Sequence, residues 1–409
     1  MLTIQHLGVA QLVARYLGVV EAVGSSPVTQ TKIPQSKDCG IFLCLKAYSQ
    51  FFTVFSRYDN MYMKTSEGTC LKCAIYTSEK LLTQRNINMT KTAYLFGEIH
   101  GSEAVCQKEF EIWQDFYKRG LRHLFMELPY FYAQFLNLWI KSGDDNILCE
   151  LWENGKGTQG NSNFNREFFV EIKKLCPETV FHGTDIGHAF NTIGTRYLET
   201  VSPDSAEYRI AAENIEQGKI YYKTWQENGN EDYIDANREK SMTENFIREF
   251  DSLNCDIVGF YGEAHVFSEE TGNFGIEKNM CSAIKNHYKD KINIKPELIK
   301  NLINPLFHSK ILINGKNYTA ENFGKVYTPF DENCEYIEIF RIAEPEHDFE
   351  KYVRQDNFIP EALYPCNMEN GDIFVIDSIN ENKAVLRQIF ICDGFSEEYG
   401  KITTEILSE

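Results

Sequence analysis

The chain has 409 residues, of which 43% are hydrophobic and 13% aromatic. This length and composition suffice for one large or two ordinary domains and exclude a wholly disordered protein. Its 59 acidic and 41 basic side chains give a formal net charge of -18, so its overall field repels nucleic acids and anionic membrane surfaces. The 12 cysteines form neither a regular disulfide spacing nor a complete zinc motif, which favours reduced thiols and a cytoplasmic location.

The first segment, residues 1–88, differs in character from the rest. It matches neither a signal peptide nor a membrane span, because polar residues such as His6 and Arg15 interrupt each apolar run. The stretches Val9–Arg15 and Gly24–Val28 can be encoded by strings that resemble the D and T arms of a tRNA gene. We interpret this segment as a non-native extension that arises from a start codon assigned too far upstream. An amphipathic N-terminal helix is the alternative.

From residue 89 onward, short apolar runs alternate with amphipathic stretches, which is the pattern of an α/β sheet. Apolar spacings of three and four predict a helix over Glu103–Arg119 with Ser102 as its N-cap. We therefore predict a largely parallel sheet flanked by helices, in a domain that covers residues 89–299. The predicted strands are Ala93–Phe96, Leu124–Met126, Thr179–Phe181 and Ile257–Tyr261.

Carboxylates and imidazoles follow all four predicted strands. They are, in chain order, Glu98 and His100, Glu127, Asp185 and His188, and Glu263 and His265. Loops at the carboxyl ends of parallel strands converge, so these side chains are expected at one edge of the sheet. Gly97-x-x-His100 and Gly262-x-x-His265 are the same motif twice, and each has a glutamate after its glycine. Such groups can form a metal site or a general acid/base pair, and an ordinary strand exit is the alternative for either motif alone.

At these residues the chain resembles the Tiki, TraB and ChaN-like superfamily, which includes the erythromycin esterase-like proteins. The resemblance covers Lys91–Ile284, and the Glu-x-His spacing is most similar to the ChaN and Tiki branches. It rests on the two GxxH motifs, Glu127-Leu128-Pro129, Gly183-x-Asp185 and the segment Arg238–Asn245.

The resemblance implies an α/β catalytic domain whose relatives include metal-dependent peptidases, esterases and haem-binding proteins. The superfamily's conserved site residues carry over to Glu98, His100, Glu127, Arg238 and His265. Secreted branches have signal or transmembrane segments, which we do not find here, so their extracellular substrates and haem uptake do not transfer directly.

The predicted function is hydrolysis of an ester or amide bond in a small molecule or peptide, and two routes stay open. In one route a divalent metal activates water. In the other, His100 is the general base, oriented by Glu127, while Arg238 stabilises the developing oxyanion. Catalytic roles are assigned to His100, Glu127, Arg238 and His265. The hypothetical metal ligands are Glu98, His100, Glu127, Glu263 and His265.

Further residues are assigned supporting roles. Those expected in the second shell or in substrate binding are Glu103, Asp185, His188 and Tyr130. The alternative function is a non-catalytic haem- or small-ligand-binding protein of the ChaN-like type, in which imidazoles and tyrosines receive the ligand. A homodimer is a further open alternative, and neither nucleic acid nor a membrane is an expected partner.

Two further regions are read from their patterns. The pattern of Ala206–Asp251 predicts a helical insertion with a break at Asn228–Asn230. This insertion is either a lid over the site or a helical hairpin without a gating role. Residues 300–409 predict a β-rich or α+β accessory region, with a hairpin at Asn314-Gly315 and an alternating strand over Tyr336–Ile342. We find no defensible chemical motif in this last region.

Overall fold

The computed structural model describes residues 90–407, except 229–230, 268–278, 330, 332–333, 346, 356, 360–362, 381, 384 and 397–400. The interpretation of residues 1–88 as an extension lies outside the described residues. The chain divides into two compact units, Met1–Met89 and Thr90–Glu409, and everything below concerns the second. No helix in its described part is long and apolar enough to cross a membrane.

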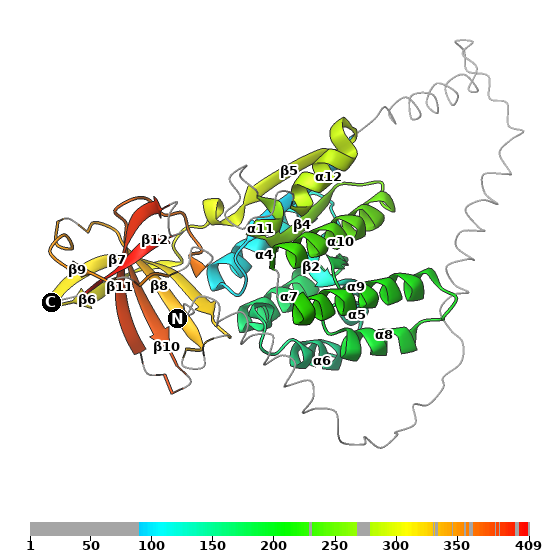
Figure 1. The fold of residues 1–409 in the computed structure, drawn as a ribbon, viewed down its shortest axis with the longest axis horizontal. Helices are drawn as coiled ribbons and strands as arrows, with labels where there is room; N and C mark the ends of the chain where they lie inside the picture. The colour runs from blue at the N-terminus through cyan, green and yellow to red at the C-terminus, as the bar shows by residue number, and fades with distance from the viewer. Residues whose placement is uncertain are drawn as a thin grey trace, which may run out of the picture. The chain divides into compact units, whose positions relative to one another are not determined.

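A five-stranded, wholly parallel sheet forms the centre of the α/β part (Figure 1). Its order is β3-β2-β4-β1-β5, so strands distant in sequence become neighbours. All four predicted strands are present, each extended at its carboxyl end by one to four residues, and β3 begins one residue later than predicted. The strands are β1 (Thr92–Glu98), β2 (His123–Pro129), β3 (Val180–Asp185), β4 (Ile257–Gly262) and β5 (Asn293–Leu298).

Helices cover both faces of this sheet, because alternate strand residues point to opposite sides. One core contains Leu124 and packs α4, α5, α6 and α7, whereas the other contains Phe125 and packs α10 and α12. The helices are α4 (Glu103–Lys118), α5 (Tyr130–Lys141), α6 (Asn146–Asn154), α7 (Asn163–Leu175), α8 (Thr195–Thr200), α9 (Ala206–Asn228), α10 (Glu231–Asp251), α11 (Glu263–Val266) and α12 (Met280–Tyr288). Shorter helical turns are η2 (Gln159–Asn161), η3 (Phe190–Gly194), η4 (Lys289–Lys291) and η5 (Ile299–Leu302).

The first helix agrees with its sequence signals. Helix α4 begins after Ser102, whose Oγ accepts a hydrogen bond from the backbone N–H of Val105 at 3.4 Å. Glu103 lies in the first turn, where a negative charge suits the helix dipole. The predicted helix is therefore confirmed, and it connects the two parallel strands β1 and β2.

The predicted helical insertion between β3 and β4 is also confirmed, because it consists largely of the long helices α9 and α10. Helix α9 lies directly on the loop that follows β3. A Cβ atom at Gly218 would lie 2.1 Å from the carbonyl oxygen of Gly187, so only a glycine permits this approach. The insertion thus packs against the loop that carries Asp185 and His188.

The C-terminal region is a seven-stranded antiparallel sheet of order β6-β7-β8-β10-β11-β12-β9, which confirms the β-rich prediction. Asn314 and Gly315 both have positive φ, 49° and 81°, as a type I′ hairpin turn requires. Both sheets belong to the unit Thr90–Glu409, and the boundary at residue 300 stays a prediction. The strands are β6 (Phe307–Ile313), β7 (Lys316–Tyr327), β8 (Tyr336–Ile342), β9 (Val353–Arg354), β10 (Ile373–Ile379), β11 (Val385–Ser396) and β12 (Lys401–Leu407).

Candidate active site

The end of β1 places a glutamate against a histidine. Glu98 is the last residue of β1, and its Oε1 contacts Nδ1 of His100 in the loop that follows. The His100 side chain keeps 35% of its surface exposed, whereas that of Glu98 is 11% exposed. A buried carboxylate thus holds one nitrogen of a solvent-accessible imidazole, which fixes the ring and leaves Nε2 available.

Glu127, in the last part of β2, connects the two halves of the site. Its Oε1 accepts a hydrogen bond from Nη2 of Arg238 at 2.6 Å and lies 3.2 Å from Nε2 of His265 and 3.7 Å from Nε2 of His100. Its Oε2 accepts a hydrogen bond from the backbone N–H of Gly262 at 2.6 Å. A Cβ atom at Gly262 would lie 3.1 Å from Nε2 of His100, so glycine there lets the two GxxH motifs approach closely.

Arg238, on α10, is paired with carboxylates from two strands. Its Nε and Nη2 donate to the two carboxylate oxygens of Asp185, at 3.0 and 2.8 Å, in a bidentate arrangement. The same Nη2 donates to Glu127, and Nη1 lies 3.3 Å from Nε2 of His265. Burial opposes the charge of the guanidinium, but Asp185 and Glu127 outweigh it and raise the pKa of Arg238.

Glu239 is a site residue that the sequence interpretation missed. Its Oε1 contacts Nδ1 of His265, and its Oε2 accepts a hydrogen bond from the backbone N–H of Met280 at 2.5 Å. The side chain is only 4% exposed. A signal existed, because Glu239 continues the apolar stripe of α10 that runs through Met242, Phe246 and Phe250 at spacings of three and four.

The structure therefore brings together side chains from the ends of three strands, β1, β2 and β3, and from two helices, α10 and α11. We call them the polar cluster, and they are Glu98, His100, Glu127, Asp185, Arg238, Glu239 and His265.

Buried amides hold the loop after β3 in place beside this cluster. The carbonyl oxygen of Asp185 accepts hydrogen bonds from Nδ2 of Asn214 at 2.7 Å and of Asn245 at 3.2 Å. Oδ1 of Asn214 accepts from the backbone N–H of Tyr130 at 3.0 Å, which ties this loop to the end of β2. Asn214 and Asn245 are each 1% exposed, so these bonds are shielded from water.

Opposing charges set the protonation of the cluster. Burial would raise the pKa of Glu127, but His265, His100 and Arg238 together hold it well below its usual range. Burial likewise opposes the ionised form of Asp185, yet Arg238 and His188 hold its pKa low. For His100, burial lowers the pKa, while Glu98 and Glu127 outweigh it and raise the pKa well above the usual value. Glu127 and Asp185 are therefore ionised at neutral pH, and His100 binds a proton readily.

His265 gives a stability prediction. Burial lowers its pKa, but Glu127 and Glu239 outweigh burial and raise the pKa from 6.5 to about 9. Because the folded state binds this proton more tightly, the stabilisation is complete below pH 6.5 and is lost as the pH rises through 9. A shift of this size corresponds to about 3 kcal/mol in the free energy of unfolding. Urea unfolding of the wild type and His265→Gln at pH 6 and pH 10 measures it.

The expected result is that the stability gap between these two proteins narrows at pH 10. If the difference in the free energy of unfolding between the two proteins were the same at pH 6 and pH 10, the result would contradict the proton assigned to His265. His100 has a raised pKa as well and is present in both proteins, so its contribution cancels from the comparison.

Four predicted supporting residues have varied positions. Asp185 belongs to the cluster, and its Oδ2 accepts a hydrogen bond from Nε2 of His188 at 3.0 Å. Glu103 instead accepts a hydrogen bond from the backbone N–H of Lys325 on β7, at 3.2 Å. Tyr130 is 5% exposed and packs edge-on against Tyr197, with ring centroids 6.0 Å apart.

The predicted metal centre does not fit the donor atoms. Glu263, expected as a ligand, bonds instead to Nζ of Lys300 at 2.8 Å. Both Glu127 oxygens are already bonded, to Arg238 and to the backbone N–H of Gly262, and the guanidinium supplies the positive charge between the carboxylates. Among residues 90–407, in so far as the structure describes them, no group of three or more His, Cys, Asp or Glu side chains is arranged to hold a metal ion. Haem binding stays a prediction.

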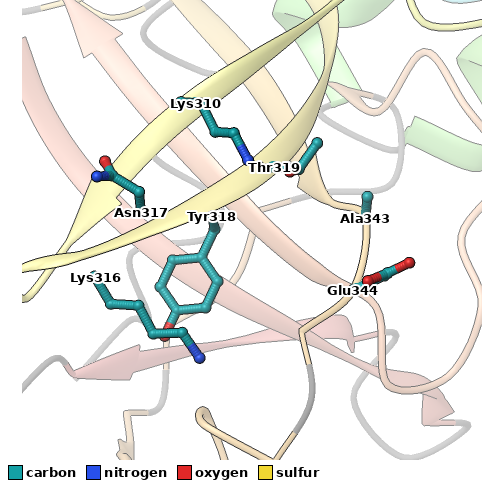
Figure 2. A pocket seen from close by; sticks show the side chains of 7 residues that line it. All are labelled: Lys310, Lys316, Asn317, Tyr318, Thr319, Ala343 and Glu344. Atoms are coloured by element: carbon teal, nitrogen blue, oxygen red, sulfur yellow. Dashed lines mark hydrogen bonds between the residues drawn. The ribbon is translucent and has the colours of Figure 1, made fainter.

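A hollow of about 250 Å³ lies elsewhere, on the C-terminal sheet (Figure 2). Both lysines that line it are already bonded, since Lys310 donates to Oγ1 of Thr319 at 2.7 Å and Lys316 pairs with Asp348. No histidine lines it. The lining residues are Lys310, Lys316, Asn317, Tyr318, Thr319, Ala343 and Glu344.

Comparison with known proteins gives little beyond this geometry. No protein-family model and no curated protein matches the chain. A structural genomics protein from Bacillus cereus is similar, with 14% identity over 80% of this chain and 88% of that chain and a TM-score of 0.42. An erythromycin esterase EreC mutant in its open conformation has 10% identity over 73% and 85%, with a TM-score of 0.40.

A succinoglycan biosynthesis protein is also similar, with 13% identity over 57% of this chain and 70% of that chain and a TM-score of 0.37. No TM-score among these structures exceeds 0.42, which is too low to support a conclusion about function. The resemblance to the ChaN and Tiki branches stays a prediction.

Proposed function

We propose that this chain is a hydrolase of carboxylic esters that works without a metal and uses His100 to activate water. One observation carries the proposal: a partly exposed imidazole is held by the largely buried carboxylate of Glu98 beside a largely buried, carboxylate-bound arginine. The first pair supplies a base, and the second supplies positive charge where an oxyanion would form.

The base is organised by its two carboxylate neighbours. Because Glu98 holds Nδ1, the lone pair of a neutral His100 is on Nε2. The 3.7 Å between this nitrogen and Oε1 of Glu127 is too long for a direct hydrogen bond. A water molecule bound to Nε2 can also reach Glu127, which would orient it for attack on a carbonyl carbon.

The developing negative charge has two cationic neighbours. Nε and Nη2 of Arg238 are bonded to carboxylates, so Nη1 is the nitrogen that can donate to an oxyanion. At neutral pH His265 is an imidazolium, because its pKa is raised to about 9. Neither cation has to reorganise during the reaction, since Asp185 and Glu239 hold them in place.

The proton balance favours an ester over an amide. His100 takes one proton from water as the new C–O bond forms, and it returns that proton to the leaving alkoxide as the old C–O bond breaks. An amide nitrogen must be protonated before it can leave. A single imidazole would then have to complete the proton transfer before the C–N bond breaks. The products are one carboxylic acid and one alcohol.

The proposed function is tested with a panel of simple methyl and p-nitrophenyl esters, before and after dialysis against EDTA. We expect hydrolysis that resists the chelator and that rises with pH above neutrality, because the base form of His100 must lose a tightly bound proton. Loss of activity on dialysis, with recovery on adding a divalent metal, would overturn the metal-independent route. Absence of ester hydrolysis across the panel would overturn the function itself.

A further inference from the structure

Helix α9 presents aromatic side chains beside the polar cluster. Tyr221, Tyr222 and Trp225 are each only partly buried. The rings of Tyr221 and Tyr222 are perpendicular, with centroids 5.2 Å apart. The rings of Tyr221 and Trp225 are stacked, with an interplanar angle of 28° and centroids 6.5 Å apart. Large aromatic side chains that remain partly exposed in one patch often mark a ligand surface.

This patch is continuous with the cluster through hydrogen bonds. The hydroxyl of Tyr222 lies 2.6 Å from Nδ1 of His188, and the other nitrogen of that imidazole lies 3.0 Å from Oδ2 of Asp185. Asp185 in turn binds Arg238. The His188 ring also meets Tyr221 edge-on, with centroids 6.2 Å apart. A substrate held at Arg238 would therefore extend toward these rings.

We propose that Tyr221 and Trp225 form a ring-binding wall that receives a phenyl-sized apolar group of the substrate next to Arg238. This inference rests on the proposed function, and it names the substrate class as esters of aryl-bearing carboxylic acids. A further ring can extend this stacked pair on one of its outer faces, while the hydroxyl of Tyr222 is engaged by His188. The amphipathic rings suit a site that is apolar on one side and wet on the other.

Binding and turnover are measured separately. The binding probe is phenylacetamide, which resists hydrolysis, titrated by calorimetry into the full chain. The turnover probes are methyl phenylacetate and methyl acetate, which differ by one phenyl ring. The test variant is Trp225→Ala. The control is Tyr208→Ala, which removes a partly buried ring from the same helix, about 25 Å from Trp225 along the helix axis.

We expect Trp225→Ala to weaken phenylacetamide binding about tenfold and to raise KM for methyl phenylacetate relative to methyl acetate by a similar factor. Tyr208→Ala should leave the phenylacetamide affinity at the wild-type value. No heat of binding in the wild type, or equal affinity in the wild type and Trp225→Ala, overturns the wall.

The two proposals fail in distinguishable ways. If phenylacetamide binds and Trp225→Ala weakens this binding while no ester is hydrolysed, the ring-binding wall is supported and the proposed hydrolase function is contradicted. If both methyl esters are hydrolysed, and the ratio of their KM values is the same in the wild type and in Trp225→Ala, the hydrolase function is supported and the ring-binding wall is contradicted.

Discussion

Replacing Arg238 by methionine is expected to lower the free energy of unfolding at pH 7 by about 3–5 kcal/mol. Methionine fills much of the same volume but donates no hydrogen bonds. It would leave Glu127, with a side chain 9% exposed, and Asp185, 2% exposed, as buried carboxylates without their shared cation. The cost arises from these uncompensated charges more than from the lost attraction itself. Equilibrium urea unfolding measures it.

A matched control separates burial from charge. Arg354→Met removes a guanidinium from an ion pair with Asp393, but the Arg354 side chain is 56% exposed. Exposed pairs contribute about 0–1 kcal/mol, so this variant should unfold near the wild-type midpoint. Equal losses in the two variants would contradict the account of Arg238 as the counter-ion of a buried cluster.

Proton uptake gives a second check on the same variant. With Arg238 absent, burial should raise the pKa of Glu127 and Asp185, because the cation that holds both values low is gone. The two carboxyls then take up protons at mildly acidic pH, and the stability deficit of Arg238→Met should be smaller at pH 5 than at pH 7. Adding Asp185→Asn to the variant should recover part of the loss at pH 7. A deficit that stays constant across this range would point to lost packing instead.

The convergence of the site was predictable from the sequence because parallel strands impose it. Glu98, Glu127 and His265 each follow an apolar strand, and a parallel sheet brings its carboxyl ends to one edge. Arg238 could be added only through its resemblance to a known motif, since an arginine on an amphipathic helix usually reads as a solvated side chain. The structure places it 19% exposed between two carboxylates.

The partners within the site were less predictable, because they depend on side-chain directions that spacing does not fix. Glu263 stands next to a strand end like Glu98, yet it turns to Lys300, a residue beyond the helix that follows. Glu239 lies beside Arg238 in sequence and contacts Nδ1 of His265, whereas Arg238 lies next to Nε2 of the same ring. Neighbouring residues on a helix point about 100° apart, and here both still reach the cluster, Arg238 at Asp185 and Glu239 at His265.

The aromatic wall escaped prediction for a similar reason. The sequence pattern places Tyr221, Tyr222 and Trp225 in an amphipathic helix. It does not indicate that this helix packs on the loop that follows β3. That loop is fixed by the contact between Gly187 and Gly218 and by Asn214. Contacts between residues so far apart in the chain are set by packing, which local periodicity does not encode.

The second large effect is expected for His100→Asn, which should lower kcat/KM for ester hydrolysis by about 10²–10⁴-fold. Asparagine can still accept and donate hydrogen bonds, but it cannot take a proton from water near neutral pH. The His100 side chain is 35% exposed, so the fold should tolerate the change. His308→Asn is the matched control, because this imidazole on β6 is 62% exposed and far from the cluster in sequence. Steady-state kinetics and thermal unfolding of both variants measure the two effects.

The variant Glu98→Gln tests whether His100 acts as the base or only contributes to the structure of the site. The charge of Glu98 helps to raise the pKa of His100, so removing that charge should lower this pKa. The rising limb of the kcat/KM profile should therefore move to lower pH, even as the plateau falls because the ring is less firmly held. A profile that keeps its midpoint in Glu98→Gln, or an His100→Asn variant with near-wild-type kcat/KM, would remove His100 from the role of base. A shifted midpoint would identify the proton on His100 as the one that limits the reaction.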